Sequence, residues 1–246
     1  MITIDNIVVP YDFSERCRAA AGHAVALAQH FEAPMSLLHV IPYSSFEYAA
    51  LEGGSYAGVV WPSEQDMTDR LQKELDGLAA PAELKQACRL VALKGEPVLR
   101  ISEYAEKFDS PLVVMPTRGH GGFRRFVLGS VATKVLHDLT CPVLTGAHME
   151  DHPHFAGGKY QQVACALNLT EHSEHTLRFA VDFARSWNAR LTVVHAVPWL
   201  FGPDEDGGML PDTVRQSLLD ESEDEAAALM RHHIVDAPRR LKSPPG

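Results

Sequence analysis

The sequence lacks the marks of several large classes of protein. It has only 4 cysteines among 246 residues, and no two of them form a C-x-x-C pair. This pattern excludes a disulfide-rich scaffold, so we expect reduced, mostly buried thiols. No apolar run approaches the length that spans a membrane, and the first residues carry acids where a secretory signal needs a basic start. We therefore predict a cytoplasmic protein with no membrane partner.

The chain also lacks an excess of positive charge. Lys and Arg together number 22 against 32 for Asp and Glu, which gives a formal net charge of −10. A surface of this charge repels phosphate backbones and anionic lipid head groups. We therefore expect no nucleic-acid partner, and any anion site must be a local feature.

Motifs of a catalytic or metal site are missing as well. The sequence has no G-x-S-x-G, no catalytic cysteine pattern and no paired carboxylates at a plausible site. Histidines gather in EHSEH (171–175) and HMEDHPH (148–154), and Glu171 and His175 are spaced as zinc ligands on one helix face. Neither stretch matches H-E-x-x-H, and a solvated helix start and a polar linker explain them more simply. We predict no metal site and no dedicated enzyme.

What the chain does have is an alternation of apolar strands and amphipathic helices. The apolar runs predict strands at 2–10, 35–42, 87–93, 110–116 and 141–147. Between them the patterns predict helices at 14–31, 63–78, 97–108 and 130–138. Apolar strands that alternate with helices predict an α/β fold, with a parallel sheet that helices cover on both faces. Ligands bind to such sheets beyond the carboxyl ends of the strands, where the strand order reverses.

One stretch at such a strand end, MPTRGHGGFRRFVLGS (115–130), carries four glycines and three arginines. Glycines allow consecutive N–H groups to face an anion, and Gly129 and Ser130 at a helix start add free N–H donors and the helix dipole. The stretch matches neither a P-loop nor G-x-G-x-x-G. Its spacing indicates an anion site without naming the anion. The alternative is that Ser130 only caps a helix and the arginines form a solvated face.

An internal repeat follows the first five strands. An offset of 156 residues aligns SLLHVIP (36–42) with TVVHAVP (192–198), and VVPYDFSE (8–15) with ACALNLTE (164–171), without a gap. We interpret the second half as a diverged partial copy of the first, with two strands and two helices.

This repeat predicts the domain organisation. We expect a complete first domain over 1–147, a polar linker over 148–159 and a truncated second domain over 160–246. The final residues, RRLKSPPG, have the composition of a disordered tail.

With the repeat and the glycine-rich stretch together, the chain resembles the universal stress protein family. The resemblance rests on VVPYDFSE after the first strand opens, LLHV in the second strand, GEP after the third, and GSVATKVLHDLTCPVL leading into the fifth. The family's glycine motif places Gly-Ser nine residues after a glycine, as Gly119 and Gly129-Ser130 stand here. It implies an open five-stranded parallel sheet in the order 3-2-1-4-5, with ATP at the switch point in one branch of the family.

The resemblance also implies roles for single residues. Asp12 is expected to hold the ribose or adenine end of ATP, and Val40 to meet adenine through its backbone. Ser130 and its neighbours are expected to cradle the phosphates, with Mg²⁺ as an optional companion. The complete expected nucleotide-binding set is Pro10, Tyr11, Asp12, Val40, Met115, Thr117, Arg118, Gly119, Gly129, Ser130 and Val131.

Two residues depart from the family pattern. Pro116 replaces the first glycine of the motif and has no N–H, so a backbone contact made by that glycine is changed here. Tyr11 replaces a small residue, and its ring would either stack on adenine or crowd it. In the second copy Asn168 replaces Asp12, so we expect no nucleotide there.

These observations lead to one expected function and two alternatives. We expect a stress-response regulator that binds ATP in its first domain and forms a homodimer. The alternatives are a nucleotide-free scaffold that dimerises through the edge strand at 141–146, and a slow ATPase, for which only Asp12 and His120 are candidate bases.

Overall fold

The computed structural model describes residues 2–43, 62–117, 128–146, 149, 159–168, 170, 173–195 and 212–233. The chain divides into two compact units. The first comprises Thr3–Gly158, and the second comprises Lys159–Gly246 together with Met1–Ile2.

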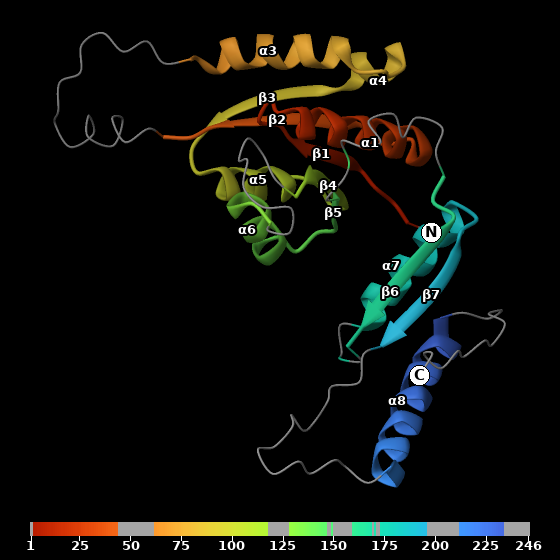
Figure 1. Cartoon of the computed structure of the whole chain (residues 1–246). Coiled ribbons are helices and arrows are strands. Elements are labelled where there is room, and N and C mark those ends of the chain that lie inside the picture. The colour runs from red at the N-terminus through yellow and green to blue at the C-terminus, as the bar shows by residue number, and fades with distance from the viewer. Residues whose placement is uncertain are drawn as a thin grey trace. The chain divides into compact units, whose positions relative to one another are not determined.

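The first unit is built on a parallel five-stranded sheet in the order β3-β2-β1-β4-β5 (Figure 1). The strands are β1 (Asn6–Pro10), β2 (Met35–Ile41), β3 (Arg89–Lys94), β4 (Pro111–Pro116) and β5 (Val143–Gly146). This is the predicted order. The chain moves from β1 outward to β2 and β3, then returns to β1's other side with β4. The switch point therefore lies between the carboxyl ends of β1 and β4.

Helices cover both faces of this sheet. They are α1 (Glu15–Phe31), α3 (Glu64–Gly77), α4 (Ala82–Ala87), α5 (Pro97–Ala105) and α6 (Ser130–Asp138). Helices α1, α3 and α4 lie on one face, and α5 and α6 lie on the other (Figure 1). The short α4 was not predicted, and α5 ends before Phe108, where the prediction placed its end. The first strand is shorter than predicted, because the chain bends at Asp5, whose N–H donates to the carbonyl of Ser110 at 3.1 Å.

The burial of each element follows from its sequence. Every residue of β1 and of β4 is buried, as expected for central strands of a sheet covered on both faces. The core under α5 and α6 includes Val8, Leu38 and Val113 from the strands and Ile101 and Val135 from the helices. This core fixes the face of the sheet on which α6 rests.

Predicted local signals are present at the helix ends. Ser14 caps α1, since its Oγ accepts the N–H of Cys17 at 3.2 Å. Pro97 opens α5, and Gly95 just before it has a φ of +147°, a conformation that side-chain-bearing residues rarely adopt. All four cysteines are free; Cys17 and Cys165 are buried and the other two are half-buried.

The second unit contains a two-stranded parallel sheet of β6 (Gln162–Leu167) and β7 (Arg190–His195), with α7 (Ser173–Ser186) and α8 (Asp212–His233). It is a partial second copy, with the two strands and two helices that were predicted. Its register repeats that of the first unit: Val163 pairs with Leu191 as Ile7 pairs with Met35, 156 residues earlier.

Finer details of the backbone repeat at the same offset. Glu32 and Asn188 have positive φ values of 51° and 52°. The Nδ1 of His39 donates to the carbonyl of Tyr11 at 2.7 Å, and His195 donates to Leu167 at 2.8 Å. Both histidines are therefore hydrogen-bonded strand residues.

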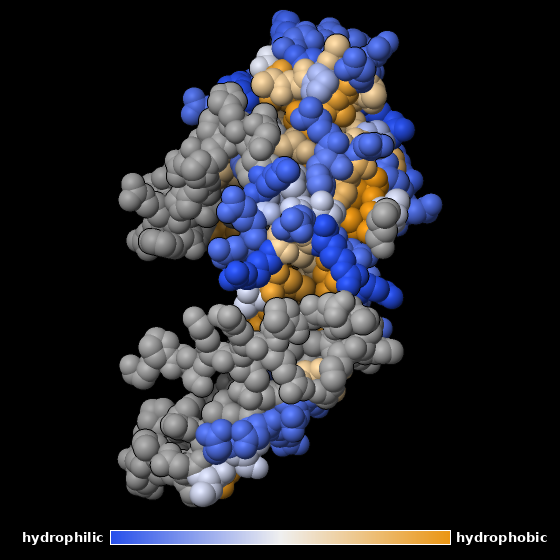
Figure 2. All heavy atoms as spheres, turned by 90° about the vertical axis from the view of Figure 1, so that its right-hand side faces the viewer, coloured by the Kyte–Doolittle hydropathy of each residue, from blue (hydrophilic) through white to orange (hydrophobic). Residues whose placement is uncertain are grey.

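Exposed hydrophobic side chains are scattered over the described residues. On the face drawn in Figure 2, hydrophobic surface shows in small areas among hydrophilic side chains. The large apolar residues with the greatest exposure include Leu99 at 53% and Val194 at 47%. Among the described helices, none combines the length and the apolar character that a membrane crossing requires.

Candidate functional site

Three central strands end together at one edge of the first sheet. Val8 pairs with Ser36 of β2 on one side and with Val113 of β4 on the other. The three strands are therefore parallel and in register, and their carboxyl ends lie along one edge of the sheet. Pro10, Val40 and Met115 come from these three ends, as the predicted site requires.

Apolar side chains form the floor beneath this edge. Met115 is 6% exposed, and the half-buried Val40 packs against the same core under α5 and α6. Thr145 of β5 pairs in register with Met115, and its buried Oγ1 has no hydrogen-bond partner among the described residues. Sequence reasoning gave Thr145 no role, because a lone threonine in an edge strand carries no signal.

Asp12 is the second residue after β1 and supplies a carboxylate. Its Oδ1 accepts the N–H of Ser14 at 2.9 Å, which forms a tight turn at the start of α1. Burial raises the pKa of the nearby Cys17 thiol to about 12, and the Asp12 carboxylate contributes to this shift. Cys17 therefore remains a protonated thiol that donates to the carbonyl of Pro10 at 3.6 Å.

The start of α6 provides donors for an anion. Gly129 occupies the cap position with no side-chain hydrogen bond, and its carbonyl accepts the N–H of Thr133 at 2.9 Å. The N–H groups of Ser130 and Val131 in the first turn have no partner within the helix. The alternative that Ser130 caps the helix is wrong, because Ser130 is the first helical residue and Gly129 is the cap.

Thr117 connects the end of β4 to this helix. The N–H of Gly129 donates to the carbonyl of Thr117 at 2.8 Å, and the Thr117 Oγ1 lies 3.5 Å from the carbonyl of Gly146. Pro116, the last residue of β4, pairs in register with Gly146. Arg118, Gly119 and the candidate base His120 lie outside the described residues.

Tyr11 is turned toward α3. Its side chain is 3% exposed, and its Oη donates to the Oε2 of Glu74 at 2.7 Å. Arg18 also contacts this carboxylate at 2.8 Å. Burial, strengthened by the Glu74 carboxylate, raises the pKa of Tyr11 well above its ordinary value, so the phenol stays a donor. The ring is therefore held by α3 rather than exposed for stacking on adenine.

A cluster that sequence reasoning missed lies beside Asp12. Phe13 has a φ of +66°, and its ring centroid lies 4.7 Å from that of His39. The guanidinium carbon of Arg70 lies 3.9 Å from the centroid of the same ring. Burial lowers the pKa of His39, and the charge of Arg70 adds to this effect. No local sequence signal joins Arg70 to Phe13, because the contact depends on how α3 docks.

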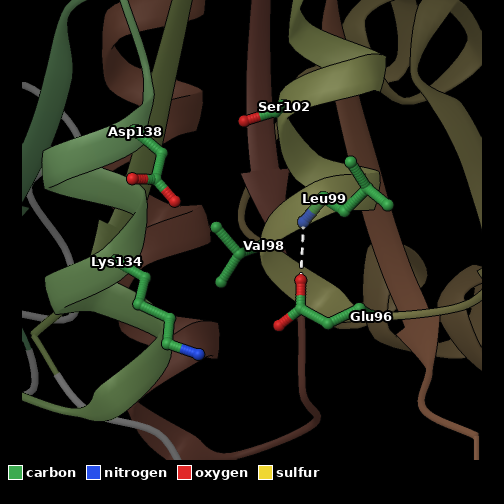
Figure 3. A pocket seen from close by; sticks show the side chains of 6 residues that line it. All are labelled: Glu96, Val98, Leu99, Ser102, Lys134 and Asp138. Atoms are coloured by element: carbon green, nitrogen blue, oxygen red, sulfur yellow. Dashed lines mark hydrogen bonds between the residues drawn. The ribbon is translucent and has the colours of Figure 1, made fainter.

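A separate groove lies between α5 and α6 (Figure 3). It has a volume of about 500 Å³ and is lined by Glu96, Val98, Leu99, Ser102, Lys134 and Asp138. The Oε2 of Glu96 accepts the N–H of Leu99 at 2.8 Å and so caps α5. Of the predicted nucleotide-binding residues that the structure describes, none lines this groove.

Metal ligands do not gather in the described part of the chain. No group of three His, Cys, Asp or Glu side chains there is placed to hold an ion. Glu171 and His172 of the EHSEH stretch, and His148 and 150–154 of the other stretch, lie outside the described residues.

Comparisons with known proteins agree with this fold. The profile of the Universal stress protein family matches residues 3–145 and again 159–243. A universal stress protein of Methanocaldococcus jannaschii is 34% identical over 146 residues, covering 56% of this chain and 79% of its own. One of Bacillus subtilis is 30% identical over 148 residues, covering 57% of this chain and 97% of its own.

A solved structure supports the fold over a longer part of the chain. A universal stress protein from Archaeoglobus fulgidus superimposes with a TM-score of 0.54 at 16% identity, covering 89% of this chain and 74% of its own. At this identity the likeness shows the fold alone. Because the family profile matches both units, the chain belongs to the universal stress protein family.

Proposed function

We propose that the chain binds an adenine nucleotide, ATP, at the carboxyl ends of β1, β2 and β4, and acts as a cytoplasmic stress-response regulator. One observation carries the proposal: a carboxylate, an apolar floor and an open helix N-terminus meet along a single sheet edge. These are Asp12, the pair Val40 and Met115, and the first turn of α6 at Ser130. The arrangement offers polar contact for a ribose, apolar contact for a base and N–H donors for phosphates.

The parts must act together to give useful affinity. A helix N-terminus stabilises an anion at an exposed site by only about 0.3–1 kcal/mol. Micromolar binding requires about 8 kcal/mol. Burial of an apolar base against Val40 and Met115 therefore has to supply a large share, at about 25 cal/mol per Å² of apolar surface removed from water. A ligand with a base, a sugar and phosphates uses every part of the site, which favours a nucleotide over a simple anion.

The residues support binding rather than catalysis. The Oδ1 of Asp12 already accepts the N–H of Ser14, and the proposal assigns Asp12 to the sugar end of the nucleotide instead of the phosphate end. We therefore propose that ATP acts as a ligand that shifts conformation or assembly. Mg²⁺ would accompany the phosphates, which together with water molecules supply most of its oxygen ligands.

The proposal is tested by the nucleotide content of the purified protein. The protein is denatured, and the released small molecules are separated by chromatography and identified by mass. We expect ATP or ADP near one per chain in the wild type and none with Asp12→Ala. Absence of nucleotide, followed by no binding when ATP and Mg²⁺ are added back, would refute the proposal.

A nucleotide-free dimerising scaffold is the second candidate. Among the described residues β5 pairs with β4 alone, and all four of its residues are half-buried. An edge strand of this kind presents unpaired N–H and C=O groups to a second chain. Sedimentation velocity over a hundredfold concentration range tests the scaffold: a monomer throughout rejects it. Because the ATP-binding regulator is also expected to dimerise, a dimer supports the scaffold only if the same protein neither holds nor binds nucleotide.

A further inference from the structure

Phe13 adopts a backbone conformation that is uncommon for a bulky residue. Its φ of +66° lies in the left-handed region, where Gly, Asn and Asp are the usual occupants. A residue persists there only when the surrounding structure holds it. Phe13 immediately follows Asp12, the acid of the proposed nucleotide site.

Three neighbours contact the Phe13 ring. Arg70 of α3 places its guanidinium carbon 3.9 Å from the ring centroid, within the range of a cation–π contact. His39 of β2 lies 4.7 Å from it, centroid to centroid, and Tyr11 lies 5.6 Å away in an edge-to-face arrangement. Residues from α3 and β2 and the residue that follows β1 thus meet on one aromatic ring.

The backbone on either side of Asp12 is also fixed. Tyr11 donates its N–H to the carbonyl of Leu38 at 2.8 Å and accepts from the Nδ1 of His39 at 2.7 Å. On the other side of Asp12, the N–H of Ser14 donates to the Oδ1 of Asp12 at 2.9 Å. Asp12 and Phe13 lie between these two hydrogen-bonded residues, so the contacts of the Phe13 ring bear directly on the turn that carries Asp12.

The second copy provides an internal comparison. It retains the histidine bond, from His195 to the carbonyl of Leu167 at 2.8 Å. At the counterparts of Asp12 and Phe13 its sequence has Asn168 and Leu169. The aromatic residue is thus absent from the copy that lacks the acid.

We propose that Phe13 and Arg70 are positioning residues that hold the turn carrying Asp12 in place for the nucleotide. This assignment rests on the proposed function. It predicts that the docking of α3 affects nucleotide affinity, although neither residue belongs to the predicted contact set. In this proposal Arg70 holds the Phe13 ring, and the Phe13 ring in turn holds the turn that positions the Asp12 carboxylate for the nucleotide.

The first test needs no ligand. Amide hydrogen exchange at Ser14, measured by NMR on the whole chain, reports whether the turn is held. We expect exchange about tenfold faster in Phe13→Asn, since Asn tolerates positive φ but lacks the ring. Arg70→Met should accelerate it about two- to fivefold, the size of an exposed cation–π contact. Phe13→Tyr keeps the ring and should match the wild type.

Glu32→Asn is the matched control. Glu32 also has a positive φ, 51°, but it lies at the end of α1 away from the nucleotide edge. This variant should leave the exchange of the Ser14 amide unchanged. Unchanged exchange in Phe13→Asn, or equal acceleration in Glu32→Asn, would overturn the proposal.

The second test measures ATP affinity by calorimetry in the same variants. Phe13→Asn should weaken binding about tenfold and Arg70→Met about two- to fivefold. In an Asp12→Asn background the effect of Arg70→Met should vanish, because Arg70 acts through the carboxylate. If Arg70→Met weakens ATP binding equally in the wild-type and Asp12→Asn backgrounds, or if Phe13→Asn binds ATP as tightly as the wild type, the proposal is overturned. If the wild type binds no ATP, the proposed function fails, and with it the role of the turn in binding, while Ser14 exchange still decides whether Phe13 and Arg70 hold the turn.

Discussion

The N–H of Gly129 donates to the carbonyl of Thr117 at 2.8 Å, so the end of β4 and the start of α6 meet directly. This bond places the open first turn of α6 at the same edge as the strand ends. Phosphates bound there would face Gly129, Ser130 and Val131.

Substitutions at Gly129, the cap of α6, distinguish an effect on fold stability from an effect on ATP affinity. Gly129→Ser and Gly129→Asp both introduce a good cap and should stabilise the fold by a few tenths of a kcal/mol. Only Asp brings a like charge to the phosphates; a repulsion of about 1–4 kcal/mol at 4 Å corresponds to a loss of affinity of about tenfold or more. Titration calorimetry and urea unfolding of both variants check this. Equal ATP affinity in the two variants would contradict a phosphate site at α6.

Tyr11 and Glu74 join the β1 end to α3, and their hydrogen bond should contribute to stability. The bond measures 2.7 Å and joins a nearly fully buried phenol to a carboxylate. Tyr11→Phe should lower the free energy of unfolding by about 1–2 kcal/mol. A double-mutant cycle with Glu74→Gln measures the pairwise part. Additive effects would mean that the two side chains do not interact in solution.

His39 should make the first unit less stable in acid. Its pKa is lowered, mainly by burial, so the folded protein holds the ring neutral below the ordinary histidine value of about 6.5. The unfolded chain then binds a proton that the folded chain does not, and stability falls as the pH drops from about 7 through 6.5. His39→Asn keeps a donor near the Nδ1 position and should reduce this slope in urea unfolding.

The control for His39 is His137→Asn, since the His137 side chain is 85% exposed on α6. An equal reduction of the slope in both variants would mean that the loss of any histidine, rather than of the buried one, changes the acid response. If His39→Asn has the same slope as the wild type, burial of His39 does not govern this acid response.

Substitution of Gly95 and of Gly77 by alanine should change the free energy of unfolding in opposite directions. Gly95 has a φ of +147°, and a Cβ there would lie 2.5 Å from the Arg100 Nε, which donates to the carbonyl of Lys94. Gly95→Ala should cost about 1–3 kcal/mol. Gly77 ends α3 with no atom within 4 Å of the same addition, so Gly77→Ala should gain up to about 1 kcal/mol. Thermal unfolding of both variants checks the pair; a shift of the same sign in both would be inconsistent with these geometries.

Apolar periodicity was enough to predict the sheet. The runs around Val8, Leu38 and Val113 are continuous because both faces of a parallel sheet are buried, and helix caps such as Ser14 leave a local signature. The resemblance to the universal stress protein family, rather than the strand pattern alone, then pointed to Asp12, Val40 and Met115 as site residues. Helix α4 was missed because six residues hold too little periodic pattern.

The side-chain contacts around Asp12 could not be predicted from local sequence patterns. Arg70 lies 57 positions after Phe13, and the docking of α3 alone brings them together. The positive φ of Phe13 runs against its residue type, so local propensity predicts the wrong conformation. The expectation that the Tyr11 ring lies near adenine failed for a similar reason. The direction of a side chain just past a strand end depends on its tertiary partner, which here is Glu74.

The central claim is a nucleotide site at the carboxyl edge of the first sheet, and calorimetric titration of nucleotide-stripped protein with ATP tests it most directly. We predict one site per chain with a Kd in the micromolar range or tighter, lost in Asp12→Ala and weakened in Gly129→Asp. No heat of binding in the wild type, or binding that both variants retain, would contradict the account.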